Sequence, residues 1–405
     1  MNILFLTLTN FNSIDERGIY TDLLREIARK QNMVYVVSPV ERRMKEKTRL
    51  IKTENAVILK VKTGNIQKTN LIEKGISTVL LETQYISAIK KYFADVKFDF
   101  ILYATPPITF AKSVEFVKKR DNAKTYLMLK DIFPQNAVDI GMMKKSGLKG
   151  ILYRYFRKKE KRLYAISDKI GCMSQANVDY ILKHNPEVPK EKVEICPNSI
   201  EMQDVSVSDE ERVGIREKYS IPLDKKVFVY GGNLGKPQGI PHIINCLRAQ
   251  KSERAYFLII GDGTEYKKLE DYINEEKPEN VRLMRKLPKE DYDKLVVGCD
   301  VGMIFLDHRF TIPNFPSRLL AYMQAGLPVL ACTDANTDVG KVIEEGGFGF
   351  FCESNDTDAF VHMVDKALSS DLKGLGENGK KYLEENYTVA GQCEIIMRSI
   401  SEITE

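Results

Sequence analysis

The sequence has no apolar run that approaches the ~20 residues needed to cross a bilayer as a helix. Its first residues, MNILFLTLTN, lack the basic start of a secretory signal peptide and instead predict a first strand. The seven cysteines are odd in number and show no CxxC spacing, and the four histidines form no metal-ligand pattern. These absences predict a soluble cytoplasmic protein with reduced thiols.

The chain also lacks a repeat of solenoid period, a low-complexity segment, a complete dinucleotide-binding fingerprint and a Walker loop. Its 405 residues, 43% hydrophobic and 29% charged, suffice for two globular domains. Residues 1–200 hold 36 Lys and Arg against 21 Asp and Glu, a net charge of +15, and the remaining residues hold 25 against 35, a net charge of −10. This asymmetry predicts that the first half faces an anionic partner.

Short apolar runs alternate with helical patterns through both halves of the chain. NILFLTL at 2–8 opens the first half, and KVFVYGG at 226–232 restarts the alternation after a polar stretch. Nearly continuous Val, Ile and Leu predict parallel strands covered on both faces, and their alternation with helices predicts two doubly wound α/β domains with a ligand in the cleft between them. The polar stretch, residues 200–224, predicts a linker with one short helix, and residues 356–404 predict helices only.

Three strand-to-helix junctions in the second half are rich in glycine or in residues that suit a phosphate: YGGNLGKPQGIPHI (230–243), IIGDGTEYKKLEDYI (259–273) and IPNFPSRLLAYMQAG (312–326). Gly235, Gly261 and Gly263 would let the backbone approach a ligand closely, and Lys236 and Arg318 supply cations. Each junction alone is equally well explained by a tight turn that needs glycine. Three junctions in one domain, two of them with a cation, favour an anionic, phosphorylated ligand.

Arg318 stands in the first turn of a predicted helix, where the helix dipole is already positive and an acid would be expected. An anion held between the guanidinium and the helix terminus would resolve this conflict. The third junction therefore predicts a phosphate site.

The order and spacing of these motifs resemble the retaining GT-B glycosyltransferases of family 4, over nearly the whole chain. NLGKPQGI resembles the first glycine loop of that family, FLIIGDGTEYKKLEDY its strand–GDG–helix segment, and FPSRLLAYMQAGLPVLA its donor-sugar motif. KDIFPQNAVDIG resembles an aspartate–proline loop of the bacterial subgroup that builds capsule, O-antigen and exopolysaccharide repeat units.

The resemblance implies a GT-B fold: an acceptor and membrane-facing domain at 1–200, a donor domain at 201–380, and a C-terminal helix at 381–405 that returns to the first domain. It also implies a UDP-sugar donor and no metal or other cofactor. The donor-binding residues it implies are Gly18, Asn233, Gly235, Lys236, Gln238, Gly261, Gly263, Lys286, Leu287, Asn314, Phe315, Pro316, Ser317 and Arg318.

Within this set, Lys236 and Arg318 would be catalytic, because they would stabilise the charge that develops on the leaving diphosphate. The segment EDYDKL at 290–295 contains the Asp-x-Asp by which another glycosyltransferase fold holds a metal. Acidic residues that complement a helix dipole explain it better.

The sequence departs from the family pattern at the donor sugar. Pro313 and Ala321 occupy the positions of two glutamates, Pro316 replaces a glycine, and Asn233 stands where many relatives have arginine. Only one glycine, Gly18, matches the usual N-terminal pair. These departures predict changed sugar recognition, with a deoxy or N-acetylated amino sugar as the donor.

On the acceptor side, Asp131 is the candidate catalytic residue that deprotonates or orients the acceptor hydroxyl. An alternative is that it only caps the following turn. Its neighbour Lys130 is a candidate contact for an acceptor phosphate. His308, near the donor loop, is better explained as a surface histidine.

The stretch KKSGLKGILYRYFRKKEKR, residues 144–162, holds nine basic residues and one acid. Apolar residues interleave with these charges, which predicts a basic amphipathic helix at an anionic membrane surface. The candidate contacts in it are Lys149, Arg154, Arg157 and Lys158. A solvated helix packed by its apolar stripe is the alternative, and no nucleic-acid-binding motif is present.

We therefore expect a retaining glycosyltransferase that moves a sugar from a UDP-sugar to a polyprenyl-diphosphate-linked saccharide. It would act as a peripheral protein at the cytoplasmic face of the plasma membrane. A GT-B sugar-nucleotide epimerase or hydrolase and a non-catalytic sugar-nucleotide-binding partner are the alternatives.

Overall fold

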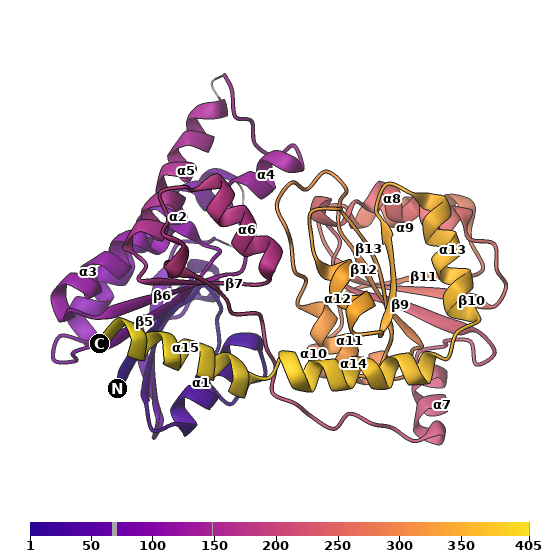
Figure 1. The fold of residues 1–405 in the computed structure, drawn as a ribbon, viewed down its shortest axis with the longest axis horizontal. Helices are drawn as coiled ribbons and strands as arrows, with labels where there is room; N and C mark the ends of the chain where they lie inside the picture. Colours follow the sequence, from indigo (N-terminus) through magenta and orange to yellow (C-terminus); the bar gives the residue numbers. More distant parts are fainter. Residues whose placement is uncertain (67–70, 148, 405) are drawn as a thin grey trace. The chain divides into compact units, whose positions relative to one another are not determined.

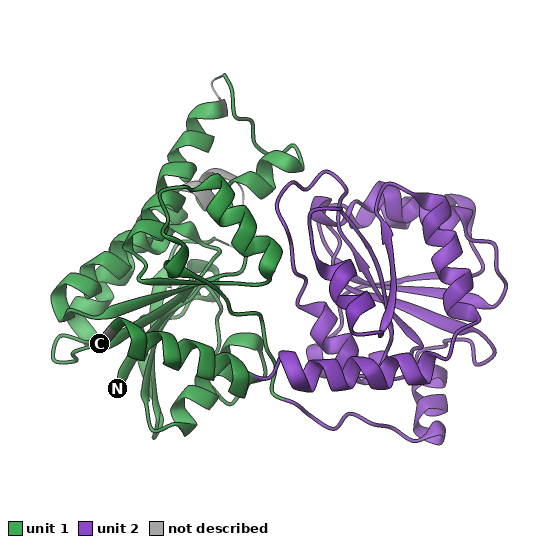
Figure 2. Ribbon diagram, in the orientation of Figure 1, with its two compact units in different colours: residues 1–201, 389–405 green, residues 202–388 purple. Residues whose placement is uncertain are grey.

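The computed structural model describes residues 1–66, 71–147 and 149–404, which form two compact units (Figures 1 and 2). Unit 1 comprises Met1–Glu201 and Val389–Glu405, and unit 2 comprises Met202–Thr388. The final segment thus leaves unit 2 at Val389 and not at residue 381, because α14 (Leu372–Asn386) packs on α11 (Arg318–Gln324) of unit 2.

Unit 1 is built on an eight-stranded sheet in the order β3-β4-β2-β1-β5-β6-β7-β8. Its strands are β1 (Asn2–Leu6), β2 (Met33–Glu41), β3 (Arg49–Lys52), β4 (Ala56–Thr63), β5 (Phe100–Ala104), β6 (Lys124–Leu129), β7 (Lys169–Cys172) and β8 (Val193–Ile195). All neighbours pair in parallel except β3, which runs antiparallel to β4 at the edge. The short, charged sequence of β3, RLIK, gave no apolar signal, and this strand was not predicted.

The helices of unit 1 are α1 (Ile19–Arg29), α2 (Leu71–Tyr92), α3 (Ala111–Asp121), α4 (Gln135–Asp139), α5 (Lys149–Ile166), α6 (Gln175–His184) and α15 (Val389–Thr404). α15 lies beside α1 (Figure 1), and its Cys393, Ile396 and Ile400 join the apolar core of this unit. Buried Gln392 fixes the start of α15, since its amide donates to Pro197 O and accepts from the Ser199 hydroxyl, both at 2.6 Å. The last helix is therefore part of unit 1, joined to it by core packing and hydrogen bonds.

Unit 2 contains a six-stranded, fully parallel sheet in the order β11-β10-β9-β12-β13-β14. Its strands are β9 (Lys226–Asn233), β10 (Ala255–Asp262), β11 (Val281–Met284), β12 (Val301–Phe305), β13 (Val329–Thr333) and β14 (Gly349–Glu353). This is the doubly wound order of a Rossmann-like sheet, and the winding direction reverses between β9 and β12. Ligands of such sheets bind beyond the carboxyl ends of the strands at this reversal, which places the loop after β9 at the expected binding position.

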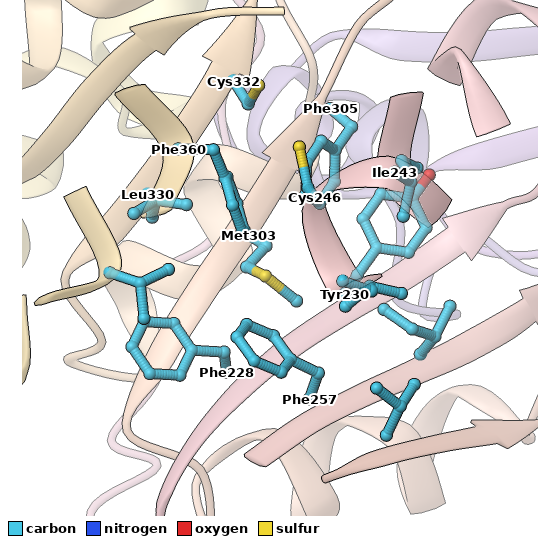
Figure 3. Close-up of a cluster of buried hydrophobic side chains, with 14 of the residues drawn as sticks. Phe228, Tyr230, Ile243, Cys246, Phe257, Met303, Phe305, Leu330, Cys332 and Phe360 are labelled. Atoms are coloured by element: carbon cyan, nitrogen blue, oxygen red, sulfur yellow. The ribbon is translucent and has the colours of Figure 1, made fainter. Parts of the chain in front are cut away.

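The helices of unit 2 are α7 (Asp209–Lys218), α8 (Ile240–Ala249), α9 (Tyr266–Glu276), α10 (Lys289–Val296), α11, α12 (Val339–Glu345), α13 (Thr357–Leu368) and α14. One side of the sheet carries a cluster of aromatic and aliphatic side chains, among them Phe228, Phe257 and Phe360 (Figure 3). The short helix predicted in the linker is α7, and Ser208 starts it with a capping box. The two Rossmann-like parallel sheets confirm the predicted α/β fold class.

Candidate functional site

Arg318 is the centre of the candidate donor site in unit 2. It is the first residue of α11, and its guanidinium carbon lies 4.4 Å from the centroid of the Tyr230 ring in β9. Its Nη1 atom is buried without a hydrogen-bond partner, and Arg318 forms no ion pair with any residue that the structure describes. A buried donor on a cation without a carboxylate partner is a position that an anion would complete.

The protonation of Arg318 follows from its surroundings. Burial lowers the pKa of the guanidinium, but Tyr230 and Tyr322 raise it, and the net pKa lies above the ordinary value. Arg318 therefore stays a cation across the physiological pH range.

Two further tyrosines fix the end of β9 beneath the guanidinium. The Tyr322 hydroxyl, four residues after Arg318 on α11, donates to Val229 O at 3.2 Å and accepts from Gly231 N at 3.3 Å. Tyr292 of α10 fills the space above Gly231, where an added Cβ would lie 1.9 Å from its hydroxyl oxygen. These tyrosines were not predicted from the sequence, although the i,i+4 spacing of Arg318 and Tyr322 places both on one face of the helix.

Gly232 lets the guanidinium lie against the strand end. Its φ of +138° lies in the region that favours glycine, and an added Cβ would lie 3.1 Å from Arg318 Nη2. Any side chain here would press on the guanidinium as well as strain the backbone.

The loop after β9 is held by hydrogen bonds among its own residues. Gln238 Oε1 accepts from Asn233 Nδ2 at 2.8 Å and from Gly235 N at 3.3 Å, and the Tyr230 hydroxyl donates to Asn233 O at 2.7 Å. Asn233 and Gln238 thus shape the loop, while Lys236 in the 3-10 turn η4 (Lys236–Gln238) is exposed. Lys236 has no ion-pair partner in the described part of the chain, so its ammonium is free to meet an anion.

Gly261 and Gly263 approach the loop after β9. An added Cβ on Gly261 would lie 1.9 Å from Gly232 O, and one on Gly263 would lie 2.2 Å from Leu234 O. Leu234 N donates to Asp262 O at 3.0 Å and joins the same two loops. The GDG sequence is therefore explained by close backbone packing within unit 2, a tighter constraint than the ligand contact expected from the sequence.

The segment before α11 carries a second unpartnered donor. Asn314 Nδ2 is buried without a hydrogen-bond partner, whereas the main-chain carbonyl of Asn314 accepts from the Thr337 hydroxyl. Phe315 is buried, with its ring centroid 6.0 Å from that of Tyr387, whereas Pro316 and Ser317 form the turn into the helix. Asn314 and Arg318 thus leave two buried N–H donors unused within five residues.

Lys286 and Leu287 lie in the loop between β11 and α10, with the lysine exposed and the leucine partly buried. The adjacent Arg285, which the sequence analysis did not single out, lies 3.5 Å from the Tyr266 ring centroid and 3.4 Å from both Asp262 and Glu270 carboxylates. Arg285 is therefore paired, unlike Lys286, for which the described residues offer no acid.

The Asp-x-Asp segment opens α10. Asp291 lies in its first turn, and Asp293 pairs with Lys289 at 2.7 Å. His308 is half exposed and lies 3.7 Å from Asp307, whose carboxylate is already bound by Arg309. In residues 1–66, 71–147 and 149–404, no cluster of His, Cys, Asp and Glu is arranged to hold a metal ion.

Unit 1 carries the remaining candidates. Gly18 precedes α1, and its N–H already donates to Asp22 Oδ1 at 3.2 Å. This bond within unit 1 occupies the main-chain amide of Gly18, which the resemblance implies as a donor-binding residue.

Asp131 follows β6 and is held by a local network. Asn136 Nδ2 donates to both carboxylate oxygens of Asp131 at 2.8 Å. The main-chain N–H of Asp131 donates to the Thr105 hydroxyl at 3.2 Å. Burial raises the pKa of Asp131 to about 6, against the lowering effect of backbone and Asn136 hydrogen bonds. A carboxylate with this pKa could accept a proton near neutral pH.

Lys130 points into unit 1 and not to its surface. Its Nζ is buried without a hydrogen-bond partner, and burial lowers the pKa of this amine to about 8. Lys130, the candidate contact for an acceptor phosphate, therefore has its amine buried within unit 1.

The α5 helix divides its basic residues between two environments. Arg157 pairs with Glu160 at 2.7 Å and donates to His184 O at 3.0 Å, so it stabilises unit 1. Arg154 and Lys158 are exposed and have no ion-pair partner among the described side chains, whereas the Lys149 side chain lies outside the described part.

Apolar side chains of α5 divide in the same way. Ile151, Leu152 and Tyr155 are 57%, 51% and 40% exposed, whereas Leu163 is buried. The first half of the helix therefore presents apolar and basic groups together to the surroundings. No helix in the described ranges is both long enough and apolar enough to span a membrane.

Comparison with known proteins adds to this picture. Residues 212–382 match the family of glycosyl transferases group 1. The chain is 26% identical to the probable glycosyltransferase WbjE of Pseudomonas aeruginosa over 79% of this chain and 78% of that protein. It is 23% identical to the putative colanic acid biosynthesis glycosyl transferase WcaI of Escherichia coli K12 over 67% of this chain and 66% of that protein.

Among solved structures, Alr3699/HepE of Anabaena in complex with UDP and glucose aligns with a TM-score of 0.72 and 13% identity, over 99% of this chain and all of that chain. Solved structures of sucrose-phosphate synthase from Thermosynechococcus elongatus and of the glycosyltransferase WaaG share the fold, with TM-scores of 0.75 and 0.66 at 14% identity each, over 100% and 97% of this chain and 99% and 98% of theirs. The chain therefore has a GT-B fold and contains a segment that matches glycosyl transferases group 1. Together these findings support glycosyltransferase activity as its class of function.

Proposed function

We propose that the protein is a retaining, metal-independent glycosyltransferase of family 4 that transfers a sugar from a UDP-sugar to a polyprenyl-diphosphate-linked saccharide in surface polysaccharide biosynthesis. Unit 2 binds the donor and unit 1 the acceptor. One observation carries the donor half of this proposal: Arg318, a cation with a buried, unpartnered Nη1, at the carboxyl end of β9.

The chemistry follows from the charge that develops on the donor. As the bond between the anomeric carbon and the diphosphate oxygen breaks, its electron pair passes to that oxygen, and the acceptor oxygen forms the new bond to the same carbon. Arg318 and Lys236 stabilise the departing diphosphate, which is where a preorganised donor can contribute ~3–4 kcal/mol. Asp131 orients the acceptor hydroxyl or takes its proton.

Names of similar proteins support the substrate class. HepE was solved with UDP and glucose, and WcaI is named for colanic acid biosynthesis. Because Pro313 and Ala321 occupy the positions of the family's two glutamates, we propose a deoxy or N-acetylated amino sugar in place of glucose.

The protein works as a peripheral protein at the inner face of the plasma membrane. The first half of α5 supports this placement, because it exposes the apolar side chains of Ile151, Leu152 and Tyr155. Arg154 and Lys158 lie among them and would be attracted to anionic lipid.

The test is a panel of UDP-sugars incubated with the protein, with and without a polyprenyl-diphosphate saccharide. Release of UDP that requires the acceptor supports the transferase. Conversion of the donor without acceptor would instead establish an epimerase or hydrolase, and binding without turnover would establish a sugar-nucleotide-binding partner.

A further inference from the structure

Unit 1 contains a cavity of about 350 Å³ on the side of the sheet covered by α2. It is open to the surroundings and is lined by the C-terminal half of α2, the end of β4 and the segment before β3, and it contains none of the candidate donor or acceptor residues. Its volume lies at the lower end of the range of ~300–1,000 Å³ that is usual for small-molecule sites.

The cavity is basic. Lys62 and Lys91 line it, and no Asp or Glu does. Neither lysine forms an ion pair with any residue in the described ranges, whereas nearby cations are paired, as in Lys159–Glu82 at 2.8 Å. Both lysine side chains are exposed, so their ammonium groups are available to an anion that binds at this face of the unit.

The cavity also offers groups that suit a ligand hydroxyl. Gln84 Oε1 is buried without a hydrogen-bond partner, so it requires a donor that the protein does not supply. Thr83 and Ser87, which both carry a hydroxyl, line the same space. A ligand that combines a phosphate with a hydroxyl would satisfy the two lysines and Gln84 together.

An apolar stripe leads to this cavity along α2. Ile76, Val79 and Leu80 are 58%, 57% and 48% exposed, at i, i+3 and i+4 spacing. Thr83 and Ser87 continue the same helix face, and Leu80 and Ser87 are two turns apart, ~10 Å. One face of α2 thus passes from exposed apolar side chains to a basic, polar cavity.

We propose that this cavity binds the glycerol-phosphate headgroup of an anionic phospholipid, with an acyl chain lying along Ile76, Val79 and Leu80. Lys62 and Lys91 hold the phosphate, and Gln84 accepts a hydrogen bond from a headgroup hydroxyl. The site adds a specific lipid contact to the membrane association in the proposed function. It does not require glycosyl transfer, because binding is measured without donor or acceptor, and a failure here leaves acceptor-dependent UDP release unchanged.

The test is calorimetric titration of the full chain with dihexanoylphosphatidylglycerol below its micellar concentration. We expect saturable binding that is at least tenfold weaker in the Lys62→Met/Lys91→Met variant and weaker in Gln84→Leu. The matched control is Lys52→Met/Lys97→Met, which removes two exposed lysines outside the cavity and should bind as the unmodified protein does. Circular dichroism and thermal unfolding establish that each variant is folded.

Two comparison ligands separate the alternatives. Dihexanoylphosphatidylcholine and glycerol 3-phosphate should both bind at least tenfold more weakly than dihexanoylphosphatidylglycerol. The Ile76→Ser/Leu80→Ser variant should bind dihexanoylphosphatidylglycerol more weakly than the unmodified protein does, with no change in its binding of glycerol 3-phosphate. The inference is overturned if glycerol 3-phosphate binds as tightly as the lipid, which would mean a soluble phosphate ester, or if phosphatidylcholine does, which would mean no headgroup recognition. Equal affinity in the two double-lysine variants would also overturn it.

Discussion

The guanidinium of Arg318 lies on the face of the Tyr230 ring, 4.4 Å from its centroid, with Nη1 buried and unpartnered. The aromatic face holds the cation in place without neutralising it, as a carboxylate would. This relationship leaves the positive charge available at the carboxyl end of β9, and it underlies the donor site that we propose.

Replacing Arg318 by Ala should lower kcat by about 10²–10³, since one preorganised donor to the developing charge is lost. Arg318→Lys should restore little of the lost rate, because an ammonium cannot stack flat on the Tyr230 ring and lacks the forked N–H donors of a guanidinium. The measurement is UDP release under saturating donor. The control is Arg248→Ala, which removes an exposed arginine paired with Glu276, and its rate should be unchanged. A normal rate in Arg318→Ala would remove this residue from the chemistry.

Replacing Gly263 by Ala should destabilise unit 2, because the new Cβ would lie 2.2 Å from the Leu234 carbonyl oxygen and the two loops would have to separate. Overpacking of this kind costs about 1–3 kcal/mol, and donor affinity should fall with it. Thermal unfolding and UDP titration measure both effects. In Gly214→Ala, on α7, an added Cβ meets nothing within 4 Å, so this control should be neutral or slightly stabilising. Unchanged stability of Gly263→Ala would show that the loop packing is not tight.

The pH dependence of the rate should report Asp131. Burial raises its pKa to about 6, so the carboxylate form required for proton acceptance is lost as pH falls through 6. The rate should therefore decline on the acid side with that midpoint. Because the Asn136 hydrogen bonds favour the ionised form, Asn136→Leu should move the midpoint to higher pH, whereas Asp131→Asn should abolish the acid limb along with most of the rate. An acid limb that Asn136→Leu leaves in place would assign it to another group.

Binding to vesicles should depend on the exposed half of α5. Ile151→Ser/Leu152→Ser should reduce flotation with phosphatidylglycerol vesicles, and Arg154→Ala/Lys158→Ala should reduce it most at low salt, since salt screens charge. Lys341→Ala/Lys381→Ala removes two exposed lysines of unit 2 and serves as the charge-matched control. Equal binding to anionic and neutral vesicles would contradict an electrostatic contact.

The strands and the fold could be predicted because their apolar runs are strong local signals, as in NILFLTL and VGMIFLD. β3 could not, because a four-residue charged edge strand acquires its structure only by pairing with β4. The position at which the chain leaves unit 2 was also misplaced, since the packing of α14 on α11 is a tertiary contact without a local signature.

At the site, the sequence indicated cations and glycines but not what each one touches. Gly261 and Gly263 were expected to face a ligand, and their strongest constraint is the backbone of the neighbouring loop. The burial of Lys130 and the pairing of Arg157 with Glu160 depend on residues brought together only by folding. Arg318 itself was identified because its charge conflicts with its own helix dipole, which is a local property.

The most direct test of the account is the release of UDP from a panel of UDP-sugars, measured with and without a polyprenyl-diphosphate-linked saccharide. We predict release that requires the saccharide, that is fastest with a deoxy or N-acetylated amino sugar donor, and that Arg318→Ala slows by about 10²–10³. Turnover of the donor at the same rate without any acceptor, or no turnover with any pair, would contradict it.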